Sequence, residues 1–501
     1  MEKKVPSIMS RNILFIYPPI TNETSRGLES NLISGSTISP EISFLYLETY
    51  LRSKIPGIEI AYLDFRIEDM NDAENTLSNV LNEGMFGYVG ITCYSCHYLT
   101  SIAIARIVKK INKDIVIIIG GFHPTTCPDD FTFPGSPIDY VVRGEGEISL
   151  YQILARGDKV VSSPRVVEGT QIDKLDEIPP ISLELFEKYK EKMDFSDLPV
   201  YFSRGCTFDC SFCISREGTC GLKRYRVLSP SKAITQLEIL ESYNPNRITI
   251  MDSLFGANRK WFDTITSLMQ KKNRPYKVKV EAHVDILSDE KLHALIKSGI
   301  DLTVGFENAS PQQLVLMNKT KDPMRYIYNM NRIIDTFFHS GRELVVNILI
   351  GFPGETRRTI DETFAFLARS SPKLDSTLLK FSLFRIYPGT PVFRYTPFFH
   401  DVFGSIFYTK DWWYHDVDHS LFPSIVDPSR HLDLISEITY VRDKINTLYA
   451  DLVSRGGVSS VTYKLAFIRH LSRVNRSYDG LKDRIVNLRN SVPKKFPSLA
   501  L

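Results

Sequence analysis

The sequence predicts an α/β protein built from two successive strand–helix series and a small α-helical C-terminal domain. Two observations predict this fold class. Short apolar runs alternate with segments of helical period over residues 1–160 and again over residues 198–395. These runs are continuous rather than alternating, which indicates strands buried on both faces of a parallel sheet. The chain of 501 residues is also long enough for about three domains of ordinary size.

The first series predicts a doubly wound, Rossmann-like parallel sheet over residues 1–160. Its expected strands are residues 12–17, 58–63, 88–92, 115–119 and 138–142, with helices at 42–53 and 100–110. In such sheets ligands bind beyond the carboxyl ends of the strands. Residues 161–197 show no clear period and contain Pro164, Pro179 and Pro180, so we expect a linker there.

The second series predicts a partial barrel over residues 198–395. Its six expected strands are residues 200–203, 247–251, 278–282, 302–305, 344–350 and 379–386. Six strand–helix units indicate a (β/α)6 barrel of the TIM type, because a full eight-fold barrel needs ~250 residues. Residues 396–501 have helical period over 431–453 and 459–488, which predicts the small helical domain.

Composition and charge exclude several classes of protein. With 43% apolar and 24% charged residues, the chain is neither disordered nor fibrous. No apolar run approaches the ~20 residues of a membrane helix, and the run Ile13–Ile16 is too short for a signal peptide. We therefore expect a cytoplasmic protein without a membrane partner, and the net charge of +3 suggests no nucleic-acid partner. The last 51 residues carry ten Lys and Arg against three Asp, either as solvated helix faces or as a surface for an acidic substrate or partner.

Three of the seven cysteines form a cluster directly after the first expected barrel strand. Cys206, Cys210 and Cys213 have the spacing C-x3-C-x2-C, and soft thiolates at such spacing suit an iron–sulfur cluster or zinc. Either normally takes four ligands, and Cys220 is poorly spaced to be the fourth. Three thiolates on one loop would leave one iron open for a substrate to chelate. Active sites of barrels lie on the loops after the strands, so we expect the active site here.

This cysteine loop is the signature of the radical S-adenosylmethionine (SAM) enzymes, which the sequence resembles over about residues 195–395. The resemblance implies that the three thiolates hold a [4Fe–4S] cluster, whose open iron chelates SAM. One electron then cleaves SAM to a 5′-deoxyadenosyl radical. The SAM-binding residues that it implies are Phe212, beside the adenine, with Arg226, Asp252 and Glu307. Further matching segments follow in order at 226–230, 252–255, 305–310, 317–319, 351–356 and 387–391.

The first series resembles the cobalamin-binding domains that precede the barrel in one large radical SAM class. Ser95 followed by Gly120-Gly121 matches half of the cobalamin fingerprint, and residues 120–125 and 142–147 resemble further segments of that class. The resemblance implies that the glycines admit the dimethylbenzimidazole tail between sheet and helices. The cobalamin-binding residues that it implies are Arg66, Tyr94, Ser95, Gly120, Gly121, His123, Gly144 and Glu145.

The other half of the fingerprint, Asp-x-His-x-x-Gly, is absent. Residues 63–68 (LDFRIE) stand in its place, so no histidine is available there to ligate the lower face of cobalt. We expect either Arg66 or the loop 94–97 under the corrin, with His97 a hydrogen-bonding residue rather than a ligand. Residues 40–42 (PEI) also depart from the Pro-Leu-Gly of relatives. Cys93 and Cys96 lack further zinc ligands nearby, and we expect small buried hydrophobes there.

Together the two resemblances imply a cobalamin-dependent radical SAM enzyme of the class B methyltransferase type. One SAM would methylate cobalamin and a second would supply the radical, so that an unactivated carbon of a natural product or peptide is methylated through methylcobalamin. An electron donor such as flavodoxin or ferredoxin is implied as a partner. Two alternatives stay open: the same cofactors used for ring contraction or cyclisation, and a non-catalytic cobalamin carrier or sensor. No catalytic residue follows from the sequence, and residues 412–416 (WWYHD) fit either a substrate contact or a packing plug.

Overall fold

The computed structural model describes residues 11–19, 38–214, 225–352, 354–370, 373–374, 377–384, 389–394, 440, 443–444 and 447–448. The chain divides into two units. The first comprises residues 1–207, 213–249 and 387–416, and the second comprises residues 208–212, 250–386 and 417–501. Cys220, residues 412–416 and most of the helices expected over 431–488 lie outside the described residues.

The sheet of the first unit is parallel and has the strand order β2-β1-β3-β4-β5-β6. The strands are β1 (Ile13–Tyr17), β2 (Ile60–Asp64), β3 (Tyr88–Thr92), β4 (Val116–Gly120), β5 (Tyr140–Arg143) and β6 (Arg165–Glu168). Because β1 lies between β2 and β3, the direction of winding reverses there. Doubly wound sheets bind ligands at such a switch point. The predicted doubly wound sheet is confirmed, with every expected strand boundary correct to within two residues.

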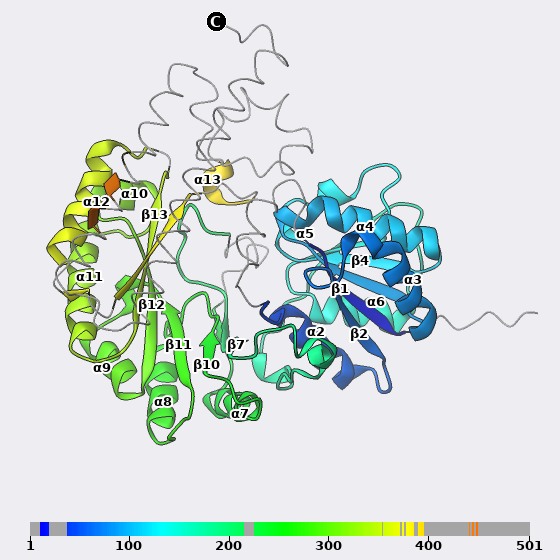
Figure 1. Cartoon of the computed structure of the whole chain (residues 1–501), viewed down its shortest axis with the longest axis horizontal. Helices are drawn as coiled ribbons and strands as arrows, with labels where there is room; N and C mark the ends of the chain where they lie inside the picture. Colours follow the sequence, from blue (N-terminus) through cyan, green and yellow to red (C-terminus); the bar gives the residue numbers. More distant parts are fainter. Residues whose placement is uncertain are drawn as a thin grey trace, which may run out of the picture. The chain divides into compact units, whose positions relative to one another are not determined.

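Helices cover both faces of this sheet, because its strands are apolar on both sides (Figure 1). The helices of the unit are α2 (Ile42–Lys54), α3 (Ala73–Gly84), α4 (Tyr98–Ile111), α5 (Phe122–Thr126), α6 (Glu147–Arg156) and α7 (Pro230–Glu241). On one face, Phe15 of β1 stacks on Phe44 of α2 with 4.8 Å between ring centroids. On the other face, Ile16 belongs to a buried cluster with Leu77 of α3 and Ile104 of α4.

The segment expected to be a linker, residues 161–197, contains structure that its sequence pattern does not reveal. β6 is an edge strand with three of its four residues exposed, so it lacks the apolar run that marks the other strands. The 3₁₀ helix η5 (Glu184–Tyr189) buries the rings of Phe186 and Tyr189. Their centroids lie 4.7 and 5.8 Å from that of Tyr62 in β2. The segment therefore packs onto the first sheet.

A second sheet has the strand order β14-β13-β12-β11-β10-β7. Its strands are β7 (Asp197–Val200), β10 (Arg247–Ile250), β11 (Lys277–Ala282), β12 (Ile300–Glu307), β13 (Leu344–Ile350) and β14 (Thr377–Leu383). Neighbours from β11 to β14 pair in parallel. The strands follow one another in chain order, as in a TIM-type partial barrel. The expected partial barrel is therefore confirmed, although β7 begins three residues earlier than expected.

Amphipathic helices line one side of strands β11–β13 (Figure 1). They are α8 (Arg259–Gln270), α9 (Asp289–Lys297), α11 (Pro323–Phe338) and α12 (Arg357–Ser370), with the short α10 (Pro311–Leu316) following β12 and α13 (Pro391–Arg394) near the end of the described chain. In α11 the buried residues Tyr326, Met330, Ile333 and Phe337 recur at helical spacing, which gives that helix one apolar face. No helix among the described residues is both long and apolar enough to cross a membrane.

Candidate functional site

The three predicted cluster ligands lie on the loop after β8 (Ser203–Arg204), a short strand that pairs with β9 (Arg226–Val227). Cys210 is buried, and Cys206 and Cys213 are half-buried. Thiolates are soft ligands, and three of them on one short loop fit an iron–sulfur cluster better than a hard cation.

The cysteine loop, residues 206–213, is anchored by the turn that follows α10. The Ser211 amide donates to the Met317 carbonyl at 2.8 Å, and the Ser211 hydroxyl donates to the Leu316 carbonyl at 3.1 Å. The side-chain amide of Asn318 donates to the Asp209 carbonyl at 2.7 Å. Asn318 has a φ of 47°, a left-handed conformation in which asparagine is enriched. The matching segment 317–319 thus holds the loop in place.

His283, directly after β11, supports the same loop. Its ring stacks on Phe208 with 3.6 Å between centroids and 12° between planes. Nδ1 accepts from the Asp285 amide at 3.2 Å and Nε2 lies 3.0 Å from the Lys319 carbonyl, which assigns the proton to Nε2. Burial, assisted by the charge of Lys319, lowers the pKa of His283 to about 2, so the ring is neutral. His283 was not predicted from the sequence, because a lone histidine after a strand carries no functional signal.

Glu307 ends β12 in a strained backbone conformation. Its φ is 67°, and the pairing of β12 with β13 shifts register between Gly305 and Glu307. Strain of this kind clusters at functional sites. The Nζ of Lys319 lies 3.2 Å from Oε1 of Glu307 and 5.6 Å from the ring centroid of Phe212. Lys319 thereby links Glu307 and Phe212, both predicted to bind SAM, whereas Asp252 is buried just after β10.

Gly305 makes room for the Glu307–Lys319 ion pair. A Cβ atom at position 305 would lie 2.5 Å from Oε1 of Glu307 and 3.0 Å from Nζ of Lys319. Both charged side chains are largely buried, and buried charges require close mutual contact. The Gly305 carbonyl is also held by the buried Tyr326 hydroxyl, which donates to it at 2.8 Å.

Glu355, in the matching segment 351–356, ties the ends of β12 and β13 together. Its carboxylate accepts from the Gly351 amide, and it accepts from the Asn308 side-chain amide at 3.0 Å. The Thr363 hydroxyl donates to the other end of the Asn308 amide at 2.9 Å. Burial raises the pKa of Glu355 to about 7. The network fixes the backbone that directly follows Glu307.

Arg226, predicted to bind SAM, forms a buried ion pair with Glu145, predicted to bind cobalamin. Glu145 also lies 3.3 Å from Arg204, which in turn lies 2.6 Å from Glu147. Burial alone would raise the pKa of Glu145, but the hydrogen bonds and charges of Arg226 and Arg204 hold it below its usual value. The network joins segment 142–147 to the two strands that flank the cysteine loop. Contacts of Arg226 with SAM and of Glu145 with cobalamin stay predictions.

Ser95 and His123, both predicted to bind cobalamin, meet beyond the ends of β3 and β4. Ser95 Oγ lies 2.9 Å from Nδ1 of His123, and Nε2 of His123 lies 3.1 Å from a carboxylate oxygen of Asp130. The imidazole is fully buried, whereas Ser95 is half-buried. Asp130, in the 3₁₀ helix η3 (Pro128–Phe131), was missed by the sequence analysis because its role depends on this contact.

Glycines allow the close approach of the loops after β3, β4 and β5. Gly121 has a φ of 110°, and a Cβ there would lie 2.8 Å from the Cys93 carbonyl. A Cβ on Gly120 would make an ordinary van der Waals contact with the Val142 carbonyl at 3.9 Å, so no close approach among the described residues requires glycine there. Gly144 has a φ of 81°, and its amide donates to the Thr125 hydroxyl at 2.9 Å.

The expectation for the cysteines after β3 is half correct. Cys93 is fully buried, and burial raises the pKa of its thiol. The expectation was wrong for Cys96, which is exposed. Cys96 lies in the 3₁₀ turn η2 (Ser95–His97), where the chain leaves the sheet and a side chain can point to solvent.

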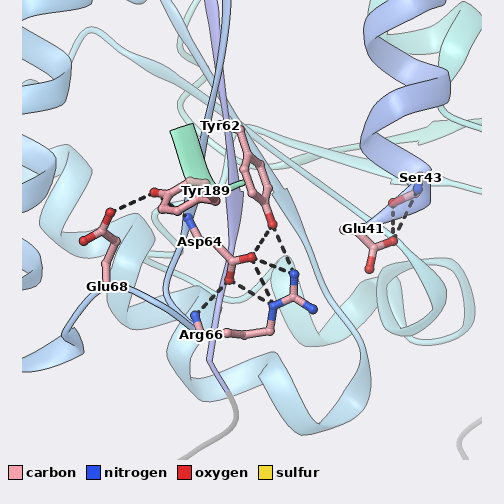
Figure 2. Close-up of polar contacts among 7 residues, drawn as sticks. All are labelled: Glu41, Ser43, Tyr62, Asp64, Arg66, Glu68 and Tyr189. Carbon is pink, nitrogen blue, oxygen red and sulfur yellow. Dashed lines mark hydrogen bonds and ion pairs between the residues drawn. The ribbon is translucent and has the colours of Figure 1, made fainter. Parts of the chain in front are cut away.

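Arg66 stands where the fingerprint has its histidine. Figure 2 shows its guanidinium against the carboxylate of Asp64, at 2.6 Å, and the Tyr62 hydroxyl donates to the same carboxylate at 2.6 Å. Asp64 is fully buried. The Tyr189 hydroxyl accepts from the Asp64 amide at 3.3 Å and donates to Glu68 at 2.9 Å. The segment expected to be a linker therefore braces this cluster.

Aromatic rings surround Arg66 at the same sheet edge. Its guanidinium lies 3.9 Å from the ring centroid of Tyr17, and His97 packs edge-on against Tyr17 at 5.1 Å and Tyr94 at 5.5 Å. Burial and the charge of Arg66 lower the pKa of His97 to about 3. Its Nδ1 has no hydrogen-bond partner among the described residues, so the ring is held here by packing. The charge of Glu41, which caps α2 (Figure 2), is the largest cause of the raised pKa of Tyr94.

Comparison with known proteins finds a family match for each of the two predicted strand–helix series. Residues 200–367 match the Radical SAM superfamily, and residues 31–154 match the B12 binding domain. The chain is 26% identical over 424 residues to an uncharacterized methyltransferase of Pyrococcus horikoshii, covering 80% of this chain and 85% of that protein. It is 26% identical over 389 residues to an anaerobic magnesium-protoporphyrin IX monomethyl ester cyclase of Rubrivivax gelatinosus, covering 72% and 66%.

A solved structure has the same fold. The radical SAM methyltransferase TsrM from Kitasatospora setae, with tryptophan substrate and a SAM analog bound, superposes with a TM-score of 0.59 and 20% identity, covering 76% of this chain and 75% of that chain. Another structure of TsrM holds cobalamin and a [4Fe–4S] cluster. With a B12 binding domain ahead of a radical SAM domain, the chain belongs to the cobalamin-binding radical SAM enzymes, whose cofactors are SAM, a [4Fe–4S] cluster and cobalamin.

Proposed function

We propose that the protein is a radical SAM methyltransferase that uses cobalamin to methylate an unactivated carbon of a natural product or peptide. One observation carries the proposal. The three-cysteine loop is anchored beside the Glu307–Lys319 pair, in a chain that also has a B12 binding domain. The bound cofactors supply the radical and the methyl group, and the protein aligns them.

The chain's own residues bind and position. Cys206, Cys210 and Cys213 would hold the cluster on a loop that Ser211 and Asn318 fix. The carboxylate of Glu307, which Lys319 holds at 3.2 Å, would accept hydrogen bonds from SAM. Because the pair is largely buried, its geometry is fixed before SAM binds.

The substrate class rests on similarity alone. Tryptophan bound to TsrM favours a small molecule or peptide as the substrate here. We also propose a flavodoxin or ferredoxin as the electron donor. A cytoplasmic location fits, because cysteine ligands stay reduced there.

A second candidate is a cobalamin-dependent radical cyclase or ring-contracting enzyme. The observation that favours it is the similarity to the magnesium-protoporphyrin monomethyl ester cyclase. A non-catalytic cobalamin carrier is disfavoured, because a carrier has no use for the cysteine loop or for the buried Glu307.

Counting coproducts tests these candidates. Radical methylation consumes two SAM per turnover, so we expect one 5′-deoxyadenosine and one S-adenosylhomocysteine for each product heavier by one methylene. A cyclase would give 5′-deoxyadenosine without matching S-adenosylhomocysteine, and polar methylation would give S-adenosylhomocysteine alone. The assay uses SAM, a reductant and tryptophan first, then peptides encoded beside the gene, with mass spectrometry over one time course. The Cys210→Ala variant is the control, and a ratio far from one excludes the proposed mechanism.

A further inference from the structure

The side chains of Ser95, His123 and Asp130 form a hydrogen-bonded chain whose direction the predicted cobalamin contacts do not determine. Its two links measure 2.9 and 3.1 Å. The imidazole is fully buried, while the serine end is half-buried. The backbone builds this contact, because the His123 amide donates to the Cys93 carbonyl at 3.1 Å and draws α5 against the end of β3. Asp130 at the other end is also partly exposed, and the Ser95 hydroxyl is the end that lies in the turn after β3.

We propose that His123 and Asp130 are positioning residues that make the Ser95 hydroxyl a hydrogen-bond donor to an unprotonated ring nitrogen of the cobalamin tail. The inference rests on the proposed function, which requires bound cobalamin, and on the predicted role of Ser95 as a cobalamin-binding residue. It concerns the direction of one hydrogen bond, which Ser95 alone does not determine.

The position of the protons on the imidazole sets the direction of the hydrogen bond to Ser95. If Nε2 carries the only proton and donates it to Asp130, then Nδ1 accepts the Ser95 hydroxyl proton, and Ser95 can only accept from a ligand. A proton on Nδ1 reverses this link, because Nδ1 then donates to Ser95 Oγ and releases the hydroxyl hydrogen. A benzimidazole displaced from cobalt has a lone pair and no N–H on that nitrogen, so it needs a donor. Binding of the tail therefore requires a hydrogen on Nδ1 of His123, while the Asp130 carboxylate faces Nε2 on the other side of the ring.

The groups packed around His123 agree with this arrangement. Asp130 supplies a carboxylate from η3, and the Tyr98 ring of α4 packs edge-on at 5.6 Å. The Tyr98 hydroxyl donates to the Asp130 carbonyl at 2.7 Å and so fixes the element that carries the carboxylate. Burial raises the pKa of Cys127 to about 12, so that thiol stays neutral. The next charges are Asp129 on η3 and Arg143 of β5, which both act on Cys127.

Binding of two corrinoids tests the proposal without an activity assay. Hydroxocobalamin carries the tail, and cobinamide lacks it. We expect Ser95→Ala and His123→Phe to weaken hydroxocobalamin binding about tenfold, the value of one well-placed hydrogen bond. Cobinamide affinity should change less than about twofold, which also shows that the variants are folded. Equal losses for both corrinoids, or no loss for either, would overturn the proposal.

The conservative variant His123→Asn gives a readout that a merely structural role would not move. Its side-chain amide N–H can donate to Ser95 Oγ in place of Nδ1, so we expect His123→Asn to keep hydroxocobalamin affinity within about twofold of wild type, while His123→Phe loses it. An Asn variant that binds hydroxocobalamin as weakly as His123→Phe would contradict the proposal.

Two further results of these experiments would have different meanings. Ligand atoms of His123, Cys127 and Asp130 lie within 4.8 Å of one another. Stoichiometric zinc in the purified protein that disappears in Cys127→Ser would overturn the proposal, because zinc on either ring nitrogen of His123 would replace its hydrogen bond to Ser95 or to Asp130. A wild type that binds neither corrinoid would contradict the proposed function itself, and the inference with it.

Discussion

At position 305 any side chain would meet the buried pair of Glu307 and Lys319. A Cβ in Gly305→Ala would lie 2.5 Å from the Glu307 carboxylate, so we expect the pair to shift at a cost of about 1–3 kcal/mol. SAM affinity, measured by equilibrium dialysis, should fall about tenfold or more. Gly341→Ala is the matched control, since its φ of 67° costs strain but nothing lies within 4 Å. Unchanged SAM affinity in Gly305→Ala would argue against Glu307 as a SAM ligand.

His283 makes the stability of the protein pH-dependent. Its pKa is lowered to about 2 in the fold, whereas an unfolded histidine has a pKa of about 6.5. Below this pH His283 is protonated in the unfolded state but neutral in the native state. The free energy of unfolding therefore falls as the pH drops below about 6.5, by up to ~1.4 kcal/mol per pH unit. In scanning calorimetry between about pH 7.5 and about pH 5.5, His283→Phe should show a shallower loss of melting temperature than wild type. His293→Gln, at an exposed position of α9, controls for the loss of an imidazole; equal slopes for wild type and His283→Phe would refute the assignment.

At the scale of the element, the spacing of the cysteines in the loop predicts which three side chains bind the iron–sulfur cluster. Replacing Cys206, Cys210 or Cys213 by Ala should abolish the brown iron–sulfur chromophore, because a three-thiolate site has no spare ligand. Cys220→Ala should leave it intact. Iron analysis after anaerobic reconstitution measures the outcome, and retention of iron in Cys210→Ala would show that the assignment is wrong.

The turn after α10 should control how firmly that loop holds its cluster. Asn318→Gly keeps the φ of 47° without strain but removes the 2.7 Å hydrogen bond to the Asp209 carbonyl. We expect normal iron content but faster loss of the chromophore to a chelator, about threefold to tenfold for one hydrogen bond. Asn244→Gly, at another left-handed asparagine, is the control. Identical rates for wild type and Asn318→Gly would mean that the contact does not stabilise the loop.

For the whole molecule, the surroundings of Arg66 predict how cobalt is held. An arginine cannot ligate a metal, and this one is paired with the buried Asp64. We expect cob(II)alamin in the protein to show no nitrogen superhyperfine splitting in its paramagnetic resonance spectrum. Arg66→His restores the fingerprint histidine next to Asp64 and should introduce the splitting. A nitrogen signal in the wild type would contradict this interpretation of residues 63–68.

Local pattern was enough to predict most of the fold. Continuous apolar runs such as residues 115–119 marked strands because burial on both faces leaves no polar side. β6 was not predicted, because an exposed edge strand has no such run. The cysteine spacing predicted a metal site because ligands on one loop are close in space whenever the chain is ordered.

Contacts between segments distant in the chain were decided by tertiary structure alone. The stacking of His283 on Phe208, the pairing of Arg226 with Glu145 and the chain from Ser95 through His123 to Asp130 have no signature in the sequence. Each joins residues whose types are ordinary in their local context. Their chemistry arises only when the fold removes water and brings the partners within hydrogen-bond distance, because a charge or an imidazole acquires its state from its surroundings. The sequence by itself thus determined the fold class, the cysteine loop and the cofactors, while the tertiary structure decided which side chains hold and orient one another.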